Sequence, residues 1–378
     1  MQELVLTARS NLVAKYGEGV IGALERILGR GAGGGPERQL LFIDDERYVR
    51  PLGVAPVRSI EPEAIKRLLD RLDASLDRRG ELPVHYCILG GDDIVPFYRL
   101  PNPTLDGDEI VLSDNPYASR DDEFLVPERS LGRLPDGVLS GSGAGDPRRW
   151  LAVIEQSLGP VETRCPASTD RAEAFGCSAS VWKDSSRVVF SVIGEPDDLR
   201  ISPPLTRENF SPTWLAARRW LYFNLHGLPD RPGWYGQAAP DDPPEYPAYP
   251  CLIDPTQIGR ASGAVIASEA CYGANVVGED HATSLALAFL DAGARGFVGS
   301  TATSYGPARP PPSEADLLVA GFLRWASAGM SLGQAFLRAK VEFAETMLER
   351  QGFLDADDRK TLLEFVLFAD PIFVVSSD

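Results

Sequence analysis

Cys271 and His226 are the two residues whose types and positions are best suited to chemistry. Cys271 follows an apolar run at 262–270, and His226 follows another at 219–225. A thiolate is a strong nucleophile that needs a nearby base or acid to work at neutral pH. An imidazole can hold the thiol proton and later return it to a leaving amine. The pair therefore predicts acyl transfer through a thioester.

Gly227, next to His226, extends the same chemistry. A residue without a side chain leaves its backbone N–H free to point at a developing oxyanion, and the N–H of Cys271 is the expected second donor.

The sequence holds three histidines. His85 lies inside an apolar run and His281 at a predicted helix start, so we expect both to be structural.

Parallel strands are the elements that must position this pair. The runs 219–225 and 262–270 are short and apolar, which is typical of buried strands. Loops beyond the carboxyl ends of parallel strands are where α/β sheets bind ligands. If the two strands are neighbours, the side chains of Cys271 and His226 meet on one rim.

The rest of the chain alternates helical and extended patterns, which indicates an α/β protein. The predicted helices are 1–30, 63–79, 147–158 and 281–293, and two that begin with capping-box pairs, Ser313 with Asp316 and Ser331 with Gln334. The other predicted strands are 39–44, 84–90, 129–137, 173–180, 294–301 and 367–375. A glycine-rich boundary at 141–147 suggests an N-terminal α/β lobe without the catalytic thiol, 1–145, and a catalytic lobe, 146–378.

Composition restricts the class of protein. The chain has 378 residues, 44% of them hydrophobic and 24% charged, which fits a globular protein of two lobes. Its net charge of −17 argues against nucleic acid and anionic membranes as partners. No apolar run is long enough to span a membrane, and the start lacks the apolar core of a signal peptide, so we expect a cytoplasmic protein. Five cysteines without a CxxC pair favour reduced thiols and no zinc.

Several collinear segments resemble the gingipain-type family of cysteine peptidases, within the caspase-like group that includes caspases, legumain, clostripain and separase. The matching segments, between about residues 80 and 375, are LGGDDIVPF, SDNPYAS, SLGRLP, YFNLHG, SEACYGA, SLALAFLDAGARGFVGSTATSYGP and FADPIF. The resemblance implies a caspase-like α/β/α sandwich with mainly parallel sheets in two lobes. It also implies peptide-bond cleavage, with Cys271 as nucleophile and His226 as general acid/base. No acid matches the family's third catalytic residue.

Three residues are candidates for substrate binding, with arginine or lysine expected at P1. Glu269 lies two residues before Cys271, and Asp184 lies near where the basic-specific gingipains keep their pocket acid. Trp234 either walls the pocket or pins the long loop that follows it. The structural alternatives are a strand-end hydrogen bond for Glu269 and an exposed helix-start acid for Asp184.

The remaining expectations concern ligands and rival functions. The acids of the first lobe, Asp92, Asp93, Asp114 and Asp122, are expected to serve turns rather than a metal. We expect no cofactor, with calcium as the alternative because some relatives bind it. The expected partners are a peptide or protein substrate and a regulatory protein. The rival functions are a catalytically silent caspase-like scaffold and another type of Cys/His acyl hydrolase.

Overall fold

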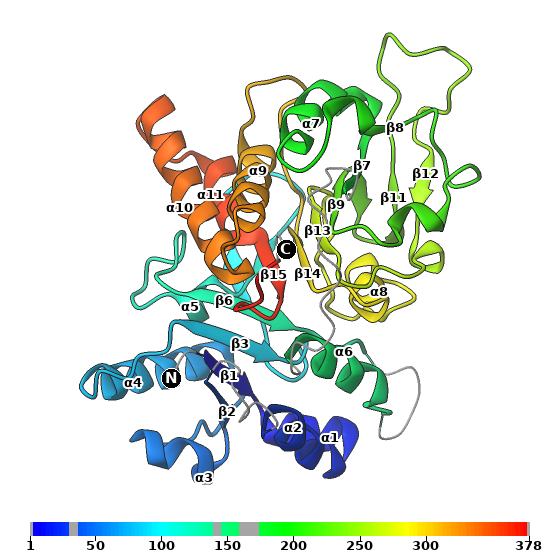
Figure 1. The fold of residues 1–378 in the computed structure, drawn as a ribbon. Helices are drawn as coiled ribbons and strands as arrows, with labels where there is room; N and C mark the ends of the chain where they lie inside the picture. Colours follow the sequence, from blue (N-terminus) through cyan, green and yellow to red (C-terminus); the bar gives the residue numbers. More distant parts are fainter. Residues whose placement is uncertain (1–2, 30–36, 139–144, 159–173, 376–378) are drawn as a thin grey trace.

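The structure is a computed structural model that describes residues 3–29, 37–138, 145–158 and 174–375, and Figure 1 shows its fold. The strands are β1 (Glu3–Thr7), β2 (Arg38–Phe42), β3 (His85–Leu89), β4 (Tyr98–Pro101), β5 (Ile110–Ser113), β6 (Ser130–Leu134), β7 (Ala174–Ala179), β8 (Arg200–Ser202), β9 (Trp220–Asn224), β10 (His226–Leu228), β11 (Arg231–Tyr235), β12 (Cys251–Ile253), β13 (Val265–Ser268), β14 (Gly296–Ser300) and β15 (Phe365–Ala369). The helices are α1 (Arg9–Tyr16), α2 (Gly19–Gly29), α3 (Glu46–Val49), α4 (Pro62–Asp77), α5 (Asn115–Ala118), α6 (Arg148–Leu158), α7 (Lys183–Phe190), α8 (Leu285–Asp291), α9 (Glu314–Ser327), α10 (Leu332–Gln351) and α11 (Ala356–Glu364).

A ten-stranded sheet in the order β2-β1-β3-β6-β15-β14-β13-β9-β7-β8 forms the centre of the molecule. All neighbouring strands are parallel except β14 and β15. The sheet therefore consists of two parallel blocks that run in opposite directions and meet at β15. Strand β15 pairs with β14 over five residues, but with β6 only through Phe368 and Arg133.

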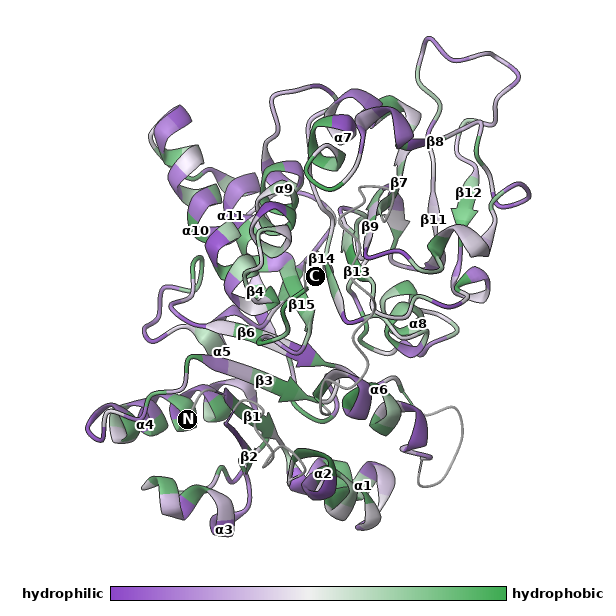
Figure 2. Ribbon diagram, in the orientation of Figure 1, coloured by the Kyte–Doolittle hydropathy of each residue, from purple (hydrophilic) through white to green (hydrophobic). Residues whose placement is uncertain are grey.

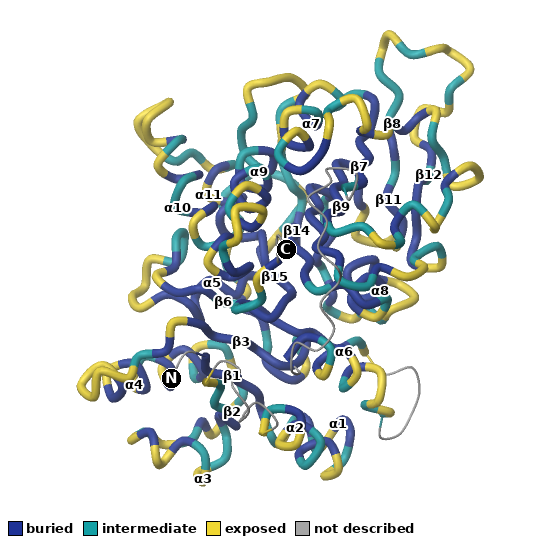
Figure 3. Tube along the Cα trace, in the orientation of Figure 1, coloured by how far each residue is buried: buried dark blue, intermediate teal, exposed yellow. Residues whose placement is uncertain are grey.

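Helices cover both faces of the sheet, so the fold is an α/β/α sandwich (Figure 1). Residues of β9 alternate between the two faces, as the pleat of a strand requires. Leu221 and Phe223 belong to the apolar cluster that contains α8, whereas Trp220 and Tyr222 belong to the cluster that contains α9 and α10. Figures 2 and 3 show that the central strands are hydrophobic and buried, while the exposed residues lie on outer helices and loops.

Two small antiparallel sheets lie outside the central sheet. One joins β10, β11 and β12, and the other is the hairpin of β4 and β5. Strand β10 begins at His226, two residues after β9 ends. The chain thus leaves the central sheet at the position of the predicted catalytic histidine.

The predicted strands and helices after residue 38 are confirmed with ends that differ by a few residues, except the strand predicted at 367–375, since β15 ends at Ala369. The prediction of one helix over 1–30 is wrong, because the segment forms β1 followed by two helices, α1 and α2. Glu3–Thr7 forms β1, and all five residues are buried because the strand lies between β2 and β3. Helix α11 was not predicted, since its sequence ADDRKTLLE is short and strongly polar.

The two predicted capping boxes do not form, although their serines are at the helix starts. Ser313 and Ser331 precede α9 and α10, but neither side chain caps its helix. The Asp316 carboxylate instead accepts hydrogen bonds from Ser185 and Asn224, which ties α9 to the sheet. Asp316 is the residue that the predicted capping box of α9 would need, and its carboxylate is used for these tertiary contacts.

The predicted division into lobes 1–145 and 146–378 stays a prediction. Strands β2, β1, β3 and β6 of the first segment form one end of the central sheet. The remaining strands, β15 included, belong to the second segment. In the part of the chain that the structure describes, no helix has the length and apolar character needed to cross a membrane.

Candidate active site

Cys271 and His226 lie at the carboxyl ends of neighbouring parallel strands, as predicted. Strands β9 and β13 pair directly, and the Glu269 N–H extends the ladder by donating to the Phe223 carbonyl at 2.9 Å. The two loops then touch at Gly227. A Cβ built on Gly227 would lie 1.8 Å from the carbonyl oxygen of Cys271, so only glycine fits between the loops.

The Cys271 thiol is half-buried beside the loop that follows β14. The Ser304 N–H donates to Sγ at 3.3 Å, and the thiol donates to the Ser304 carbonyl at 3.5 Å. Burial raises the pKa of the thiol to about 11, with the nearby Glu364 acting in the same direction and the Ser304 N–H and Lys360 acting against it. The Cys271 side chain is therefore a neutral thiol at rest near pH 7.

Tyr272, the residue after Cys271, adopts a backbone conformation that is uncommon outside glycine. Tyr272 has a φ of 56° and is held there by contacts at both ends. Its N–H donates to the Ala302 carbonyl at 2.8 Å, and its hydroxyl donates to Asp108 at 2.6 Å. The turn that presents the thiol is thus fixed from the loop after β14 and from the β4–β5 hairpin.

A buried lysine organises the hairpin side of this arrangement. Lys360 of α11 has a fully buried side chain and forms ion pairs with Asp106 and Asp108, the latter at 2.7 Å. Asp108 also accepts from the Thr303 N–H at 2.8 Å, next to the Ser304 that contacts the thiol. Burial acts to raise the pKa of Asp108, but the hydrogen bonds from Lys360 and its other donors lower it overall, so the carboxylate stays charged.

His226 lies against the aromatic rings of two different segments. The Trp182 ring, in the turn after β7, has its centroid 4.4 Å from the imidazole centroid, and Tyr249 lies at 5.7 Å. The Nε2 atom forms a 2.8 Å hydrogen bond with the side-chain oxygen of Gln237. Burial lowers the pKa of the imidazole, and the Gln237 hydrogen bond partly offsets this effect.

The thiol and the imidazole make separate hydrogen bonds in this resting state. Among the described residues, no hydrogen bond joins Cys271 to His226. The Sγ atom is hydrogen-bonded to Ser304, and Nε2 is hydrogen-bonded to Gln237. Catalytic hydrogen bonds are often loose in free enzymes and tighten when substrate binds. The N–H of Cys271 interacts with its own thiol and with no other acceptor in the described ranges.

The three predicted substrate-binding residues are not brought together. Glu269 is buried on the α9 face of the sheet, where it accepts from the Tyr222 hydroxyl at 3.2 Å. Strand β13 ends at Ser268, so the chain turns before Cys271 and only the thiol reaches the rim. Burial and the charge of Asp316 raise the pKa of Glu269 well above its ordinary value.

Trp234 and Asp184 lie in contrasting surroundings. Trp234 is 3% exposed and packs on Phe223, with its ring below Gly273, so it supports the nucleophile loop from the core. Asp184 is exposed in the first turn of α7, two residues after Trp182, and lies 3.8 Å from Arg187. Of the three candidates, Asp184 alone has an exposed carboxylate, and it follows by two residues the Trp182 ring that packs on His226.

The remaining predicted residues serve the fold. Three of the first-lobe acids form ion pairs, Asp92 with Arg99, Asp93 with Lys15 and Asp114 with Arg133. The Asp122 side chain is exposed. Within the described ranges, no group of three or more His, Cys, Asp or Glu residues is suited to a metal ion.

The other two histidines differ from His226 in their surroundings. His85 is buried and hydrogen-bonds Ser130 of the neighbouring strand, and burial lowers its pKa to about 4. His281 is exposed before α8. His85 lies within β3, and His281 lies ten residues after Cys271 in the same connection between β13 and α8.

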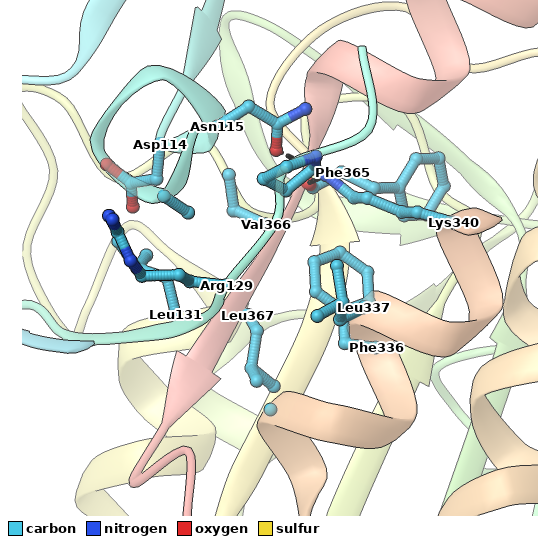
Figure 4. Close-up of a pocket in the computed structure, with 13 residues that line it drawn as sticks. Asp114, Asn115, Arg129, Leu131, Phe336, Leu337, Lys340, Phe365, Val366 and Leu367 are labelled. Carbon is cyan, nitrogen blue, oxygen red and sulfur yellow. Dashed lines mark hydrogen bonds between the residues drawn. The ribbon is translucent and has the colours of Figure 1, made fainter. Parts of the chain in front are cut away.

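A cavity of about 20 Å³ lies away from the candidate site, between β6, β15 and α10 (Figure 4). Lys340 projects along it and donates to Asn115 and to the carbonyls of Leu362 and Phe365. Burial lowers the pKa of Lys340 to about 7. The space is that of one or two water molecules, so we assign it no function.

Sequence reasoning missed the residues that hold the pair in place. Trp182, Gln237, Ser304, Asp108 and Lys360 come from five separate segments. Only Asp108 carried a visible signal, since the stretch NPTLDGD places a polar side chain at every second position from Asn102. The others are recognised by contacts between segments that are distant in sequence.

A thiol and an imidazole at the carboxyl ends of neighbouring parallel strands, on an α/β/α sandwich, define a caspase-like cysteine hydrolase. Residues 256–376 match the model of peptidase family C25. This match confirms the resemblance to the gingipain-type family and the expected class of enzyme, a cysteine peptidase. Among curated proteins, none matches the sequence.

Solved structures confirm the caspase-like fold over the whole chain. Gingipain R (RgpB), an Arg-specific cysteine proteinase, matches with a TM-score of 0.65 and 14% identity over 100% of this chain and 78% of its own. The complex of the pro- and mature domains of RgpB from Porphyromonas gingivalis matches with a TM-score of 0.62 and 12% identity, over 99% of this chain and 80% of its own. A further protease structure matches with a TM-score of 0.63 and 13% identity, over 99% and 78% of the two chains.

Proposed function

We propose that this cysteine peptidase cleaves peptide bonds with Cys271 as nucleophile and His226 as general acid/base. His226 accepts the thiol proton while Sγ attacks the scissile carbonyl carbon. The N–H groups of Gly227 and Cys271 hold the oxyanion of the tetrahedral intermediate. The intermediate collapses to a thioester, and the imidazolium gives its proton to the leaving amine. Water, deprotonated by His226, then hydrolyses the thioester and restores the thiol.

The contact between Gly227 and Cys271 is the observation that carries this proposal. A backbone approach that excludes even a methyl group brings the two proposed oxyanion donors into one narrow region. The silent-scaffold alternative has no use for such an approach. The acyl-hydrolase alternative shares this chemistry and differs only in its substrate.

Cys271→Ala is the first test of the proposed function. We expect this variant to lose all peptidase activity and to keep the wild-type circular dichroism spectrum, because the thiol makes the covalent bond. His226→Ala should be equally inactive. His85→Ala, which removes a buried ring, and His281→Ala, which removes an exposed one, are the matched controls and should retain most activity in their folded fractions. Turnover by Cys271→Ala at the wild-type rate would exclude the thioester mechanism.

We also propose a preference for arginine or lysine at P1, read by Asp184. This acid is exposed, it follows by two residues the Trp182 ring that packs on His226, and the whole chain is acidic. The structurally similar gingipain R is Arg-specific. Asp184→Asn should lower kcat/KM for arginine substrates by about fivefold or more, the equivalent of about 1 kcal/mol for an exposed ion pair.

The control for the P1 prediction is Asp197→Asn, which removes another exposed acid from a turn outside the rim. We expect it to leave the profile of a peptide library unchanged. Preferred cleavage after aspartate or a large apolar residue would contradict a basic P1 preference.

Three further proposals concern the location of the enzyme, its need for a cofactor and its control. We propose a cytoplasmic enzyme without a cofactor, controlled by a protein partner or by part of a precursor. The similar RgpB structure, which contains pro- and mature domains, supports the idea of such control.

A further inference from the structure

Gln237 is the polar side chain that engages the imidazole of His226. The hydrogen bond joins Nε2 to Oε1 of Gln237 over 2.8 Å. An amide oxygen accepts hydrogen bonds and cannot donate them. Nε2 therefore carries the proton, and in the neutral ring Nδ1 is left as the atom that can accept one.

The backbone around Gln237 is fixed by two strands of the central sheet. Its N–H donates to the Ser202 carbonyl at the end of β8, and its carbonyl accepts from Val181 after β7. A Cβ on the preceding Gly236 would lie 2.2 Å from the Ser202 hydroxyl, so the chain passes close to β8 with no room for a side chain. Gln237 thus approaches the ring from a rigid part of the molecule.

The imidazole is also confined on its faces. Trp182 follows directly from β7 and packs on the ring, while Tyr249 contacts it edge-on from the loop before β12. Of the three side chains described against the ring, only Tyr249 carries an ionisable group. Packing limits the tilt of the ring, and the hydrogen bond directs Nε2 toward Gln237 and Nδ1 away from it.

We propose that Gln237 is the positioning residue of the catalytic pair: it holds His226 by its Nε2–H, so that Nδ1 accepts the proton of Cys271. The inference rests on the function proposed above and adds the third member that the sequence did not reveal. A neutral amide orients the ring as a carboxylate would, but it stabilises an imidazolium far less, because it brings no charge.

The test compares Gln237→Leu and Gln237→Glu with the wild type, and uses Gln257→Leu as the control. Gln257 belongs to the capping box of the 3₁₀ turn after β12, and its side chain donates to the Arg207 carbonyl. The chain has three histidines, so ring-labelled histidine gives a simple NMR spectrum in which His85→Ala and His281→Ala assign the other two signals. The pKa of His226 is then read directly in the folded protein, with or without peptidase activity.

The two substitutions should act differently. Gln237→Glu should raise the pKa of His226 by about one unit, since a carboxylate favours the imidazolium, and should move the acid limb of the kcat/KM profile upward by the same amount. Gln237→Leu should lower kcat by about 10- to 100-fold with less than about twofold change in KM, because a misplaced base acts in the chemical step alone. Gln257→Leu should change neither the NMR titration nor kcat.

An unchanged His226 titration in Gln237→Glu would show that the hydrogen bond is absent and would overturn the proposal. A second result would also overturn the proposal: the His226 titration shifts in Gln237→Glu, but Gln237→Leu keeps the wild-type kcat. Gln237 would then contact His226 without positioning it as a base. If the wild-type protein cleaves no peptide, the proposed function fails, but the NMR titration still decides whether Gln237 holds the ring.

Discussion

Burial keeps both members of the catalytic pair uncharged near neutral pH. The pKa of the Cys271 thiol is raised to about 11, and the pKa of His226 is lowered from its ordinary 6.5. A thiol is deprotonated above its pKa, and an imidazole is neutral above its own. The pair therefore rests as thiol and imidazole, and the thiolate must form during the reaction by proton transfer to His226.

The neutral pair predicts a particular pH dependence of alkylation. The rate at which iodoacetamide modifies Cys271, followed by mass spectrometry of its peptide, should rise steadily from pH 6 to about pH 11, the value to which burial raises its pKa. The buried Cys177 in the same digests should stay unmodified in the folded protein. A plateau between pH 5 and 8 would reveal a preformed thiolate–imidazolium pair and contradict the neutral state.

At the scale of elements, the nucleophile turn depends on a clamp formed by three segments. Helix α11 supplies Lys360, the β4–β5 hairpin supplies Asp108, and the loop after β14 supplies Thr303. Asp108 holds the Tyr272 hydroxyl on one side of the thiol and the Thr303 N–H on the other. The position of Sγ relative to the Ser304 N–H is therefore set by a helix that makes no contact with substrate in this mechanism.

Lys360→Met tests this clamp. Removing one partner of a buried ion pair costs about 3–5 kcal/mol of stability, because the remaining charges are uncompensated. We expect this loss in urea unfolding, together with a fall in kcat of about tenfold or more at temperatures where the variant is folded, since a small displacement of the nucleophile slows the reaction.

Lys15→Met is the matched control for the clamp. Lys15 is also buried and pairs with Asp136 at 2.8 Å, but on the α1 side of the molecule. The variant should lose comparable stability and keep the wild-type kcat. Equal kcat in the two variants would show that Lys360 stabilises the fold without positioning the thiol.

At the scale of the whole molecule, β15 joins the two opposed blocks of the sheet. Phe368 is fully buried, pairs with Arg133 of β6 and stacks on Phe297 of β14 at 6.4 Å. The β6–β15 edge has only this one paired position. The cohesion of the two blocks therefore depends strongly on side chains at the junction.

Phe368→Ala should lower the free energy of unfolding by about 3–5 kcal/mol, the usual cost of emptying a buried phenylalanine site. Phe353→Ala, which removes an exposed phenylalanine after α10, should cost little. Wild-type protein should unfold in urea in one transition if β15 couples the blocks. Two well-separated transitions, or equal effects of the two substitutions, would be inconsistent with that coupling.

The sequence was informative where the signal is local. The strands that carry Cys271 and His226, their parallel arrangement and the need for Gly227 all follow from apolar runs and the residues at their ends. Helix α11 and strand β1 were missed or misassigned because burial in the finished sheet, and not local periodicity, decides their structure.

The surroundings of the site could not be predicted for the same physical reason. Glu269 was expected beside the thiol because residues two apart share a face of a strand, but β13 ends at Ser268 and the chain turns. Gln237 and Lys360 reach the site through contacts between segments far apart in sequence, and no spacing along the chain encodes such contacts.

The reversal between β14 and β15 also bears on when the enzyme can first act during its synthesis. Because β15 runs against β14, the chain enters it from the catalytic rim, and α11 must cross that rim just before. The segment that delivers Lys360 is therefore among the last parts of the described chain to leave the ribosome. A nascent chain that already carries Cys271 and His226 still lacks the cation that fixes the nucleophile turn. The order of translation thus delays proteolytic competence until the sheet can close.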